Sequence, residues 1–318
     1  MADKKIIAVV GATGAQGGGL VRAIMSDKSG QFTARALTRN PDSEKARELA
    51  ALGAEVVAAD VDDPATISSA FEGAYGAFCV TFFWEHFSPA KELEQVRTFA
   101  EAASAQGLRH VIWSTLEDTR NWVPLDDDRM PTLQGSYKVP HFDAKGEANA
   151  LFTDAGVPTT FLQTSFYWDN LIHFGMGPRA DENGNLGFAL PMGDKKLPGI
   201  AAADIGRCAY GIFKAGDEYI GRTVGIAGEH LTGAEMAAAL SEAYGQPVAY
   251  IPVPFEVYRG LDFPGADDLG NMFQFNHDFE DYFCGARPID GTRALNPKTQ
   301  GFGEWLEAHK DRIPVDSA

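Results

Sequence analysis

The chain has 318 residues, 45% hydrophobic and 22% charged, which is typical of a globular protein with one large domain or two. Its net charge of −17 argues against direct nucleic-acid binding, because neutralising phosphates requires a basic face. No apolar run approaches the roughly 18 residues of a membrane helix, and no cleavage region follows the short apolar run near the N-terminus. Three widely spaced cysteines fit neither a disulfide framework nor a zinc site. The composition therefore predicts a cytoplasmic protein without membrane or nucleic-acid partners.

The first 165 residues alternate between strand-like and helix-like patterns. Apolar runs predict strands at 5–10, 33–38, 55–59, 76–82, 110–114 and 159–164. Helical patterns lie between them at 20–25, 44–52, after Asp63-Pro64, at 88–107 and at 140–155. Strands that alternate with helices in this way form βαβ units, whose handedness favours a doubly wound parallel sheet. Residues 1–165 are therefore predicted to form an α/β Rossmann domain.

Glycine and proline become dense after residue 165, where the alternation ends. This change predicts a smaller, irregular C-terminal lobe over 166–318 that contacts a substrate or a partner. Helices are expected in it at 233–244 and 303–309, with an irregular, aromatic-rich stretch at 252–281. Segments within about 195–245 are expected to return to the first domain.

A glycine-rich loop lies directly after the first strand and directly before a helix. In that context Gly11 permits a tight turn, Gly14 lets a pyrophosphate approach the backbone, and Gly17 allows close packing. The helix N-terminus offers free N–H groups to phosphates. The expected dinucleotide-binding loop comprises Gly11, Thr13, Gly14, Ala15, Gln16 and Gly17.

The end of the second strand indicates which dinucleotide binds. NAD enzymes of this fold place a carboxylate there, whereas this chain has Arg39 and no acid. A guanidinium can pair with a 2′-phosphate, so NADP(H) is preferred over NAD(H). The alternative is that Arg39 is an ordinary surface arginine. Further cofactor contacts are expected where strands end, at Asp60, Val61, Thr81, Phe82, Thr164 and Phe166.

The chain resembles the NmrA-like family of atypical short-chain dehydrogenases, and within it the HSCARG-like branch. The resemblance runs nearly end to end, and the matching features from Phe263 onward lie outside the nucleotide fold. The matching features are Gly11-x-x-Gly14-x-x-Gly17, Thr38-Arg39-Asn40-Pro41, Gly53-Ala54-Glu55-Val56, His141-Phe142-Asp143-x-Lys145-Gly146, Phe263-Pro264-Gly265-Ala266, Asn271-Met272-Phe273, and Leu295-Asn296-Pro297 with Trp305. The resemblance implies a Rossmann domain, a small C-terminal lobe, NADP in the cleft between them, and a homodimer. Some relatives are reductases, whereas others are NADPH-sensing regulators that bind a protein partner.

The usual catalytic set of short-chain dehydrogenases is incomplete in this chain. That set contains a serine, and a tyrosine and lysine four residues apart on one helix face. Here Ser114 closes the fifth strand as a candidate substrate orienter and Lys145 lies on the expected helix, but His141 stands where the tyrosine belongs. Tyr137 lies eight residues before Lys145, outside the helix.

Three interpretations of this set stay open. Lys145 handles the proton itself, as the resemblance to isoflavone-reductase-like relatives suggests; His141 replaces the tyrosine; or Lys145 only contacts the cofactor while His141 is a packed structural residue. Aromatic side chains after the fourth and sixth strands favour a planar, uncharged substrate such as a quinone, enone, imine or aryl carbonyl. No metal site is expected, because the histidines show no ligand spacing.

These residues leave two functional hypotheses. The first is an NADPH-dependent reductase of a small aromatic substrate. The second is a non-catalytic redox sensor, whose NADPH occupancy changes its association with a regulated protein.

Overall fold

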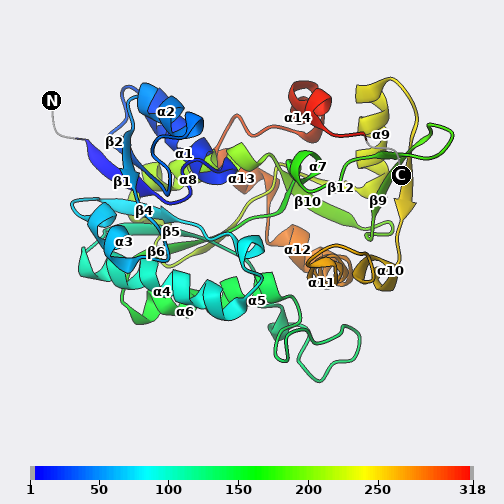
Figure 1. Ribbon diagram of the computed structural model, residues 1–318, viewed down its shortest axis with the longest axis horizontal. Helices are drawn as coiled ribbons and strands as arrows, with labels where there is room; N and C mark the ends of the chain where they lie inside the picture. Colours follow the sequence, from blue (N-terminus) through cyan, green and yellow to red (C-terminus); the bar gives the residue numbers. More distant parts are fainter. Residues whose placement is uncertain (1–3, 316–318) are drawn as a thin grey trace.

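A sheet of seven parallel strands lies at the centre of the computed structural model, which describes residues 4–315 (Figure 1). The strands follow the order β11-β6-β5-β4-β1-β2-β3. Their bounds are β1 (Lys5–Val9), β2 (Phe32–Thr38), β3 (Glu55–Ala58), β4 (Gly76–Cys79), β5 (His110–Thr115), β6 (Thr159–Gln163) and β11 (Thr223–Gly225). The predicted doubly wound parallel sheet is confirmed. The strand order reverses between β1 and β4, which is where ligands bind in sheets of this kind.

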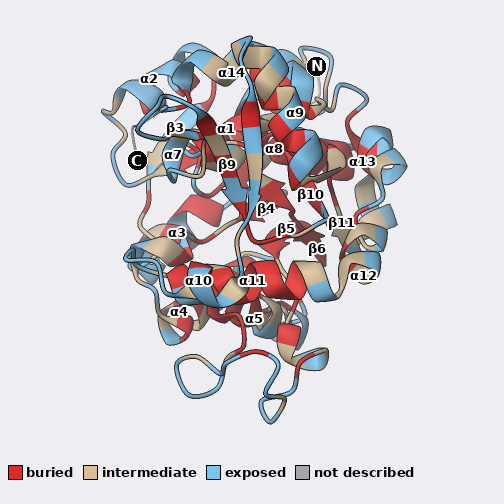
Figure 2. Ribbon diagram, turned by 90° about the vertical axis from the view of Figure 1, so that its right-hand side faces the viewer, coloured by how far each residue is buried: buried red, intermediate tan, exposed pale blue. Residues whose placement is uncertain are grey.

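Alternate residues of β1 point to opposite faces of the sheet, and each face has its own helical cover. The helices of this domain are α1 (Ala15–Ser26), α2 (Glu44–Ala51), α3 (Pro64–Phe71), α4 (Pro89–Ala105), α5 (Pro140–Glu147), α6 (Asn149–Asp154) and α8 (Ala202–Ala215). Helices α1 and α8 cover one face of the sheet, and α3, α4 and α6 cover the other (Figure 1). Ile7 and Val9 belong to the core under α1 and α8, whereas Ala8 belongs to the core under α3, α4 and α6. Every residue of β4, β5 and β6 is buried, as expected of central parallel strands (Figure 2).

Local signals explain several of these helix ends. Asp63 accepts a hydrogen bond from the Ala65 N–H and Ser88 accepts one from the Lys91 N–H, each with a proline at the first helical position. The predicted single helix over 140–155 is divided at Ala148 into α5 and α6. The fourth strand ends at Cys79, earlier than predicted, and a 3-10 turn η1 (Phe83–Glu85) follows.

The C-terminal lobe combines helices with two small sheets, each of three strands (Figure 1). Its strands are β7 (Phe166–Tyr167), β8 (Arg179–Ala180), β9 (Leu186–Leu190), β10 (Lys196–Ile200), β12 (Glu229–Thr232) and β13 (Val248–Pro252). Its helices are α7 (Asn170–His173), α9 (Gly233–Tyr244), α10 (Phe255–Arg259), α11 (Ala266–Asp278), α12 (Glu280–Gly285) and α14 (Phe302–His309). Helix α13 (Ile289–Leu295) returns to the first domain, where it packs against α8. Short 3-10 turns are η2 (Thr119–Asn121), η3 (Gly216–Tyr219) and η4 (Lys310–Arg312).

The prediction that residues 252–281 are irregular is wrong, since this segment contains α10 and α11. Helix α11 contains Gly270 and several asparagine and aspartate residues, which have low helix propensity and weaken the local signal in the sequence. It forms because Phe273 and Phe275 are completely buried in the core of the lobe, so tertiary packing overrides the weak local signal. Within 195–245, α8 covers the large sheet and β11 extends it, whereas β12 and α9 lie in the second lobe.

Candidate functional site

One cavity of about 710 Å³ opens at the carboxyl ends of the central strands and reaches the C-terminal lobe. Most residues proposed from the sequence line it, namely Gly11, Thr13, Gly14, Ala15, Gln16, Gly17, Arg39, Val61, Thr81, Phe82, Ser114, His141, Lys145, Thr164 and Phe166. Asp60 does not line it. Its carboxylate accepts a hydrogen bond from the Asp62 N–H at 3.0 Å, and Asp62 borders the cavity instead.

The glycine loop has the shape that a dinucleotide requires. Gly11 adopts a φ of +62°, which favours glycine, and Gly14 caps α1 without a side chain over the helix end. A Cβ atom on Gly17 would lie 2.5 Å from the Gly11 carbonyl oxygen. The first N–H groups of α1 therefore face the cavity across bare backbone, where a pyrophosphate fits.

Arg39 is paired in this structure. Its guanidinium donates to the Glu85 carboxylate at 2.6 Å, with both side chains half exposed or more. The hydrogen bond and charge of Glu85 raise the pKa of Arg39, to which the charges of Asp60 and Asp62 also contribute. A 2′-phosphate would therefore have to take Arg39 from Glu85.

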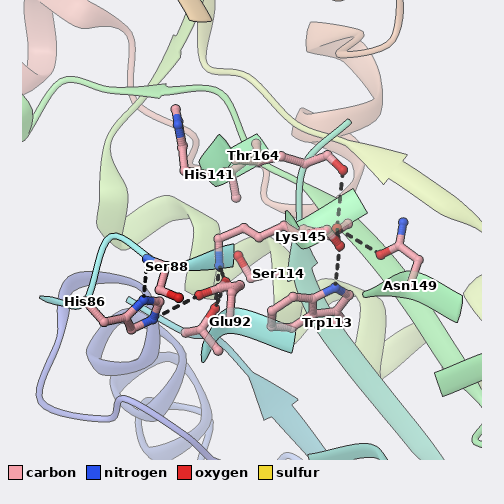
Figure 3. Close-up of polar contacts among 12 residues, drawn as sticks. His86, Ser88, Glu92, Trp113, Ser114, His141, Lys145, Asn149 and Thr164 are labelled. Carbon is pink, nitrogen blue, oxygen red and sulfur yellow. Dashed lines mark hydrogen bonds and ion pairs between the residues drawn. The ribbon is translucent and has the colours of Figure 1, made fainter. Parts of the chain in front are cut away.

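Lys145 forms a buried ion pair that the sequence analysis missed. Its Nζ donates to Glu92 Oε1 at 2.6 Å (Figure 3). It also donates to the Thr81 hydroxyl, which itself donates to Glu92. Glu92 is fully buried on α4. Burial alone raises the pKa of its carboxyl, but the charge of Lys145, the nearby His86 and hydrogen bonds from Lys145 and Thr81 outweigh this and lower it to about 2. Lys145 thus faces a permanent carboxylate at neutral pH.

His86 approaches this pair from its other side. Its Nδ1 accepts the Ser88 N–H, so the neutral ring carries its proton on Nε2, which lies 3.4 Å from Glu92 Oε2 (Figure 3). The spacing of apolar residues on α4 could have identified Glu92 as a candidate from the sequence. Glu92 lies in register with Val96 and Phe99 on the buried stripe of the helix, and a carboxylate there requires a partner.

The Glu92 pKa makes part of the stability pH-dependent. A carboxyl whose pKa falls from 4.5 to about 2 on folding stabilises the protein above pH 4.5, and this contribution is lost as pH falls toward 2. We expect the stability advantage of the wild type over Glu92→Gln to be largest near neutrality and to shrink below pH 4.5. Urea unfolding of both proteins from pH 7 to pH 2 measures it; a constant difference would contradict the assignment.

A second polar network crosses the cavity floor between strand ends. The Ser114 hydroxyl donates to Gln16 Oε1 at 2.9 Å, and Gln16 Nε2 donates to the Tyr167 hydroxyl at 2.7 Å. Tyr167 also shares a hydrogen bond of 3.1 Å with Thr164. Burial raises the pKa of Tyr167 to about 12, so its hydroxyl stays neutral at physiological pH.

His141 joins the two lobes. Its Nδ1 lies 2.6 Å from Asp268 Oδ1, and its backbone N–H donates to the other oxygen of the same carboxylate. The imidazole packs against Trp84 with ring centres 4.7 Å apart, and Figure 3 shows it pointing in a different direction from Lys145. Tyr137 lies before the start of α5, with its ring against the guanidinium of Arg120.

The C-terminal lobe supplies an apolar wall. Leu269 and Met272 of α11, Phe283 of α12, and Phe174 and Met176 near α7 line the cavity. Polar side chains of the lobe line it as well, among them Asp169, Asn170, His173 and Asn276. No lysine or arginine in the described part of this lobe, residues 166–315, borders the cavity. Within residues 4–315 no group of three or more metal-binding side chains is gathered, and no helix is long and apolar enough to cross a bilayer.

Comparison with known proteins finds one family and several relatives. The chain matches the NmrA-like family over residues 3–306. It is 31% identical to an NAD(P)H azoreductase of Xenophilus azovorans over 317 residues, covering 96% of this chain and 98% of that protein. It is 29% identical to the NmrA-like oxidoreductase FrzB of a Cladobotryum species, covering 92% and 90%.

Solved structures agree on the fold. The negative transcriptional regulator NmrA in complex with NADP matches with a TM-score of 0.77 at 24% identity, covering 96% of this chain and 95% of that one. The triphenylmethane reductase of a Citrobacter species, complexed with NADP(H), matches with a TM-score of 0.72 at 20% identity, covering 96% and 99%.

Proposed function

The chain belongs to the NmrA-like family, and from this premise we propose that it is an NADP(H)-dependent reductase of a small, uncharged aromatic carbonyl, quinone, enone or imine. One observation carries the proposal: a single cavity joins the dinucleotide loop, a buried Lys145 and an apolar wall. The azoreductase and the triphenylmethane reductase, named for aromatic substrates, support it. Three free cysteines fit a reducing compartment such as the cytoplasm.

The residues present fit the cofactor. The loop from Gly11 to Gly17 would hold its pyrophosphate, Arg39 its 2′-phosphate, and Thr164 and Phe166 would lie beside the nicotinamide. When bound, NADPH supplies a hydride to the substrate. The apolar wall excludes water from the transfer.

Lys145 completes the reaction in this proposal. Its Nζ, which lies 2.6 Å from Glu92 Oε1, would give a proton to the reduced substrate, and Ser114 would orient the substrate from the adjacent strand end. The Asp268 contact favours a positioning role for His141, which ties α5 to the substrate wall.

The direct test is NADPH consumption by the purified chain against quinones, enones, aryl aldehydes, imines and azo compounds. Turnover that disappears when Lys145 is replaced would support the proposal. Tight NADPH binding with no turnover across the panel would overturn it.

Arg39 sets the cofactor preference in this proposal. We expect Arg39→Ala to weaken NADPH binding about tenfold while changing NADH binding little, because only NADPH carries the phosphate that the guanidinium meets. Glu85→Gln removes the competing carboxylate and should shift NADPH affinity in the opposite direction. Fluorescence titration with both cofactors measures the effects; equal losses for NADPH and NADH would exclude this role for Arg39.

Gly17 tests the loop itself. A methyl group at this position would collide with the Gly11 carbonyl, and the N–H groups that hold the pyrophosphate would move. We expect Gly17→Ala to weaken NADPH and NADH alike, by about tenfold or more. Gly303→Ala is the matched control, because nothing lies within 4 Å of its added carbon. Unchanged affinity in Gly17→Ala would mean that the dinucleotide lies elsewhere.

A redox sensor is the second candidate. Two observations favour it: the tyrosine position of the catalytic set holds His141, and the His141–Asp268 contact joins the two lobes, so an occupied cavity has a route to alter their packing. The partner would be a regulated protein or a second copy of the chain. A change in oligomeric state or partner affinity on adding NADPH, without turnover, would select this candidate.

A further inference from the structure

Two residues that line the cavity each hold a buried polar atom without a hydrogen-bond partner among the described residues. The two atoms are Ser165 Oγ, in a residue 7% exposed, and Asn276 Oδ1, in a residue 2% exposed. Most buried polar groups in native proteins are paired, because burying one unpaired costs its full hydration. Two such atoms at one cavity indicate that a ligand completes their hydrogen bonds. Ser165 follows β6 directly after Thr164, which the proposed function places beside the nicotinamide, whereas Asn276 lies on α11 of the C-terminal lobe.

Asn276 stands in an otherwise apolar surface. It is the only polar side chain among the four that α11 and α12 contribute to the cavity, beside Leu269, Met272 and Phe283. The spacing of positions 269, 272 and 276 places all three on one face of α11. Asp268 on the same helix is held by His141 at 2.6 Å. The amide is thus presented on a fixed element.

We infer that Asn276 determines substrate specificity by accepting a hydrogen bond from an O–H or N–H group on a flat, uncharged aromatic substrate. An unpaired carbonyl oxygen calls for a donor, and the apolar neighbours call for an aromatic ring. Among residues 166–315 the lobe places no lysine or arginine at the cavity and His173 is its one basic side chain there, so a phosphate or carboxylate on the substrate would find no permanent counter-charge on this wall. This inference rests on the proposed reductase function, and it narrows the substrate to hydroxylated or amino-substituted aryl compounds.

The test compares 6-hydroxy-2-naphthaldehyde with its methyl ether, which differ only in the donor. Binding to the full chain saturated with NADP⁺ is measured by calorimetry, and turnover by NADPH consumption. For the wild type we expect the phenol to bind about tenfold more tightly than the ether, the effect of one hydrogen bond to a buried group. In Asn276→Leu the ratio should fall to about one, with the loss appearing mainly in KM.

Thermal unfolding separates this role from a structural one. Because the amide is unpaired in the free protein, Asn276→Leu should keep or raise the Tm. Gln274→Leu is the control on the same helix: its amide is buried but paired with Arg259 and with the Arg129 carbonyl. It should lower the Tm and keep the phenol preference.

Three results would each overturn the inference. They are a phenol preference that survives in Asn276→Leu, a lower Tm in that variant with unchanged ligand binding, and a wild type that binds neither compound. Selective binding of the phenol without any NADPH consumption would instead overturn the reductase function and leave the Asn276 subsite supported.

Discussion

Replacing Lys145 with methionine should remove turnover and destabilise the protein together. Loss of a positioned proton donor lowers kcat by about 10²–10⁴-fold. The same change leaves Glu92 buried and without its cation, which costs about 3–5 kcal/mol of the free energy of unfolding. NADPH consumption with the best substrate of the panel measures the first effect, and urea unfolding measures the second.

A double variant separates these two effects. Lys145→Met with Glu92→Gln removes both charges, so the unpaired carboxylate disappears and stability should return toward the wild-type value. Turnover should stay lost, because no side chain in the double variant replaces the lysine proton. If the double variant recovered turnover together with stability, Lys145 would be a structural residue. If the single variant kept full turnover, the proton would come from another group.

Removing Arg287 should cost as much stability, because its ion pair with Glu117 is completely buried. Its guanidinium is completely buried and meets both oxygens of Glu117 at 2.7 and 2.9 Å. It also donates to the Thr164 carbonyl at 2.8 Å and lies 3.7 Å from the ring centre of Phe283. We expect Arg287→Met to lower the free energy of unfolding by about 3–5 kcal/mol, since Glu117 is left charged and unpaired.

The same contacts place Arg287 behind the cavity. Thr164 and Phe283 line the cofactor and substrate regions, so Arg287→Met should also weaken NADPH binding, although it touches no ligand. Arg22→Met is a matched control, because its pair with Glu48 is about half exposed and should be worth at most about 1 kcal/mol. Equal unfolding free energies for the two variants would show that burial does not make the Arg287 pair important.

The sequence reveals a residue's role most readily when the residues that it interacts with lie close to it along the chain. The glycine loop and the caps at Asp63 and Ser88 depend on neighbours within a few positions, so their pattern is visible in the chain itself. The seven-stranded sheet was accessible for a related reason: each βαβ unit carries its own alternation of apolar runs. Family membership rests on motifs spread along the chain, while the assignment to the HSCARG-like branch stays a prediction.

Long-range partners were not accessible in this way. Lys145 was visible as a candidate, but Glu92 lies 53 positions away, and only the packing of α4 against α5 brings the two together. Asp268 reaches His141 across 127 positions, and Arg287 reaches Glu117 across 170. Nothing in the local sequence of these residues specifies which opposite charge they will meet.

By itself, the sequence determined the class of the fold, the place of the dinucleotide loop and the candidates Ser114, His141 and Lys145, because these depend on periodicity and short spacing. The tertiary structure decided the rest. In the interior a charged or polar group either finds a partner or stays unpaired: Lys145 pairs with Glu92, whereas the Asn276 carbonyl oxygen has no partner among the described residues. Helix α11 likewise exists because Phe273 and Phe275 are buried between elements distant in the chain.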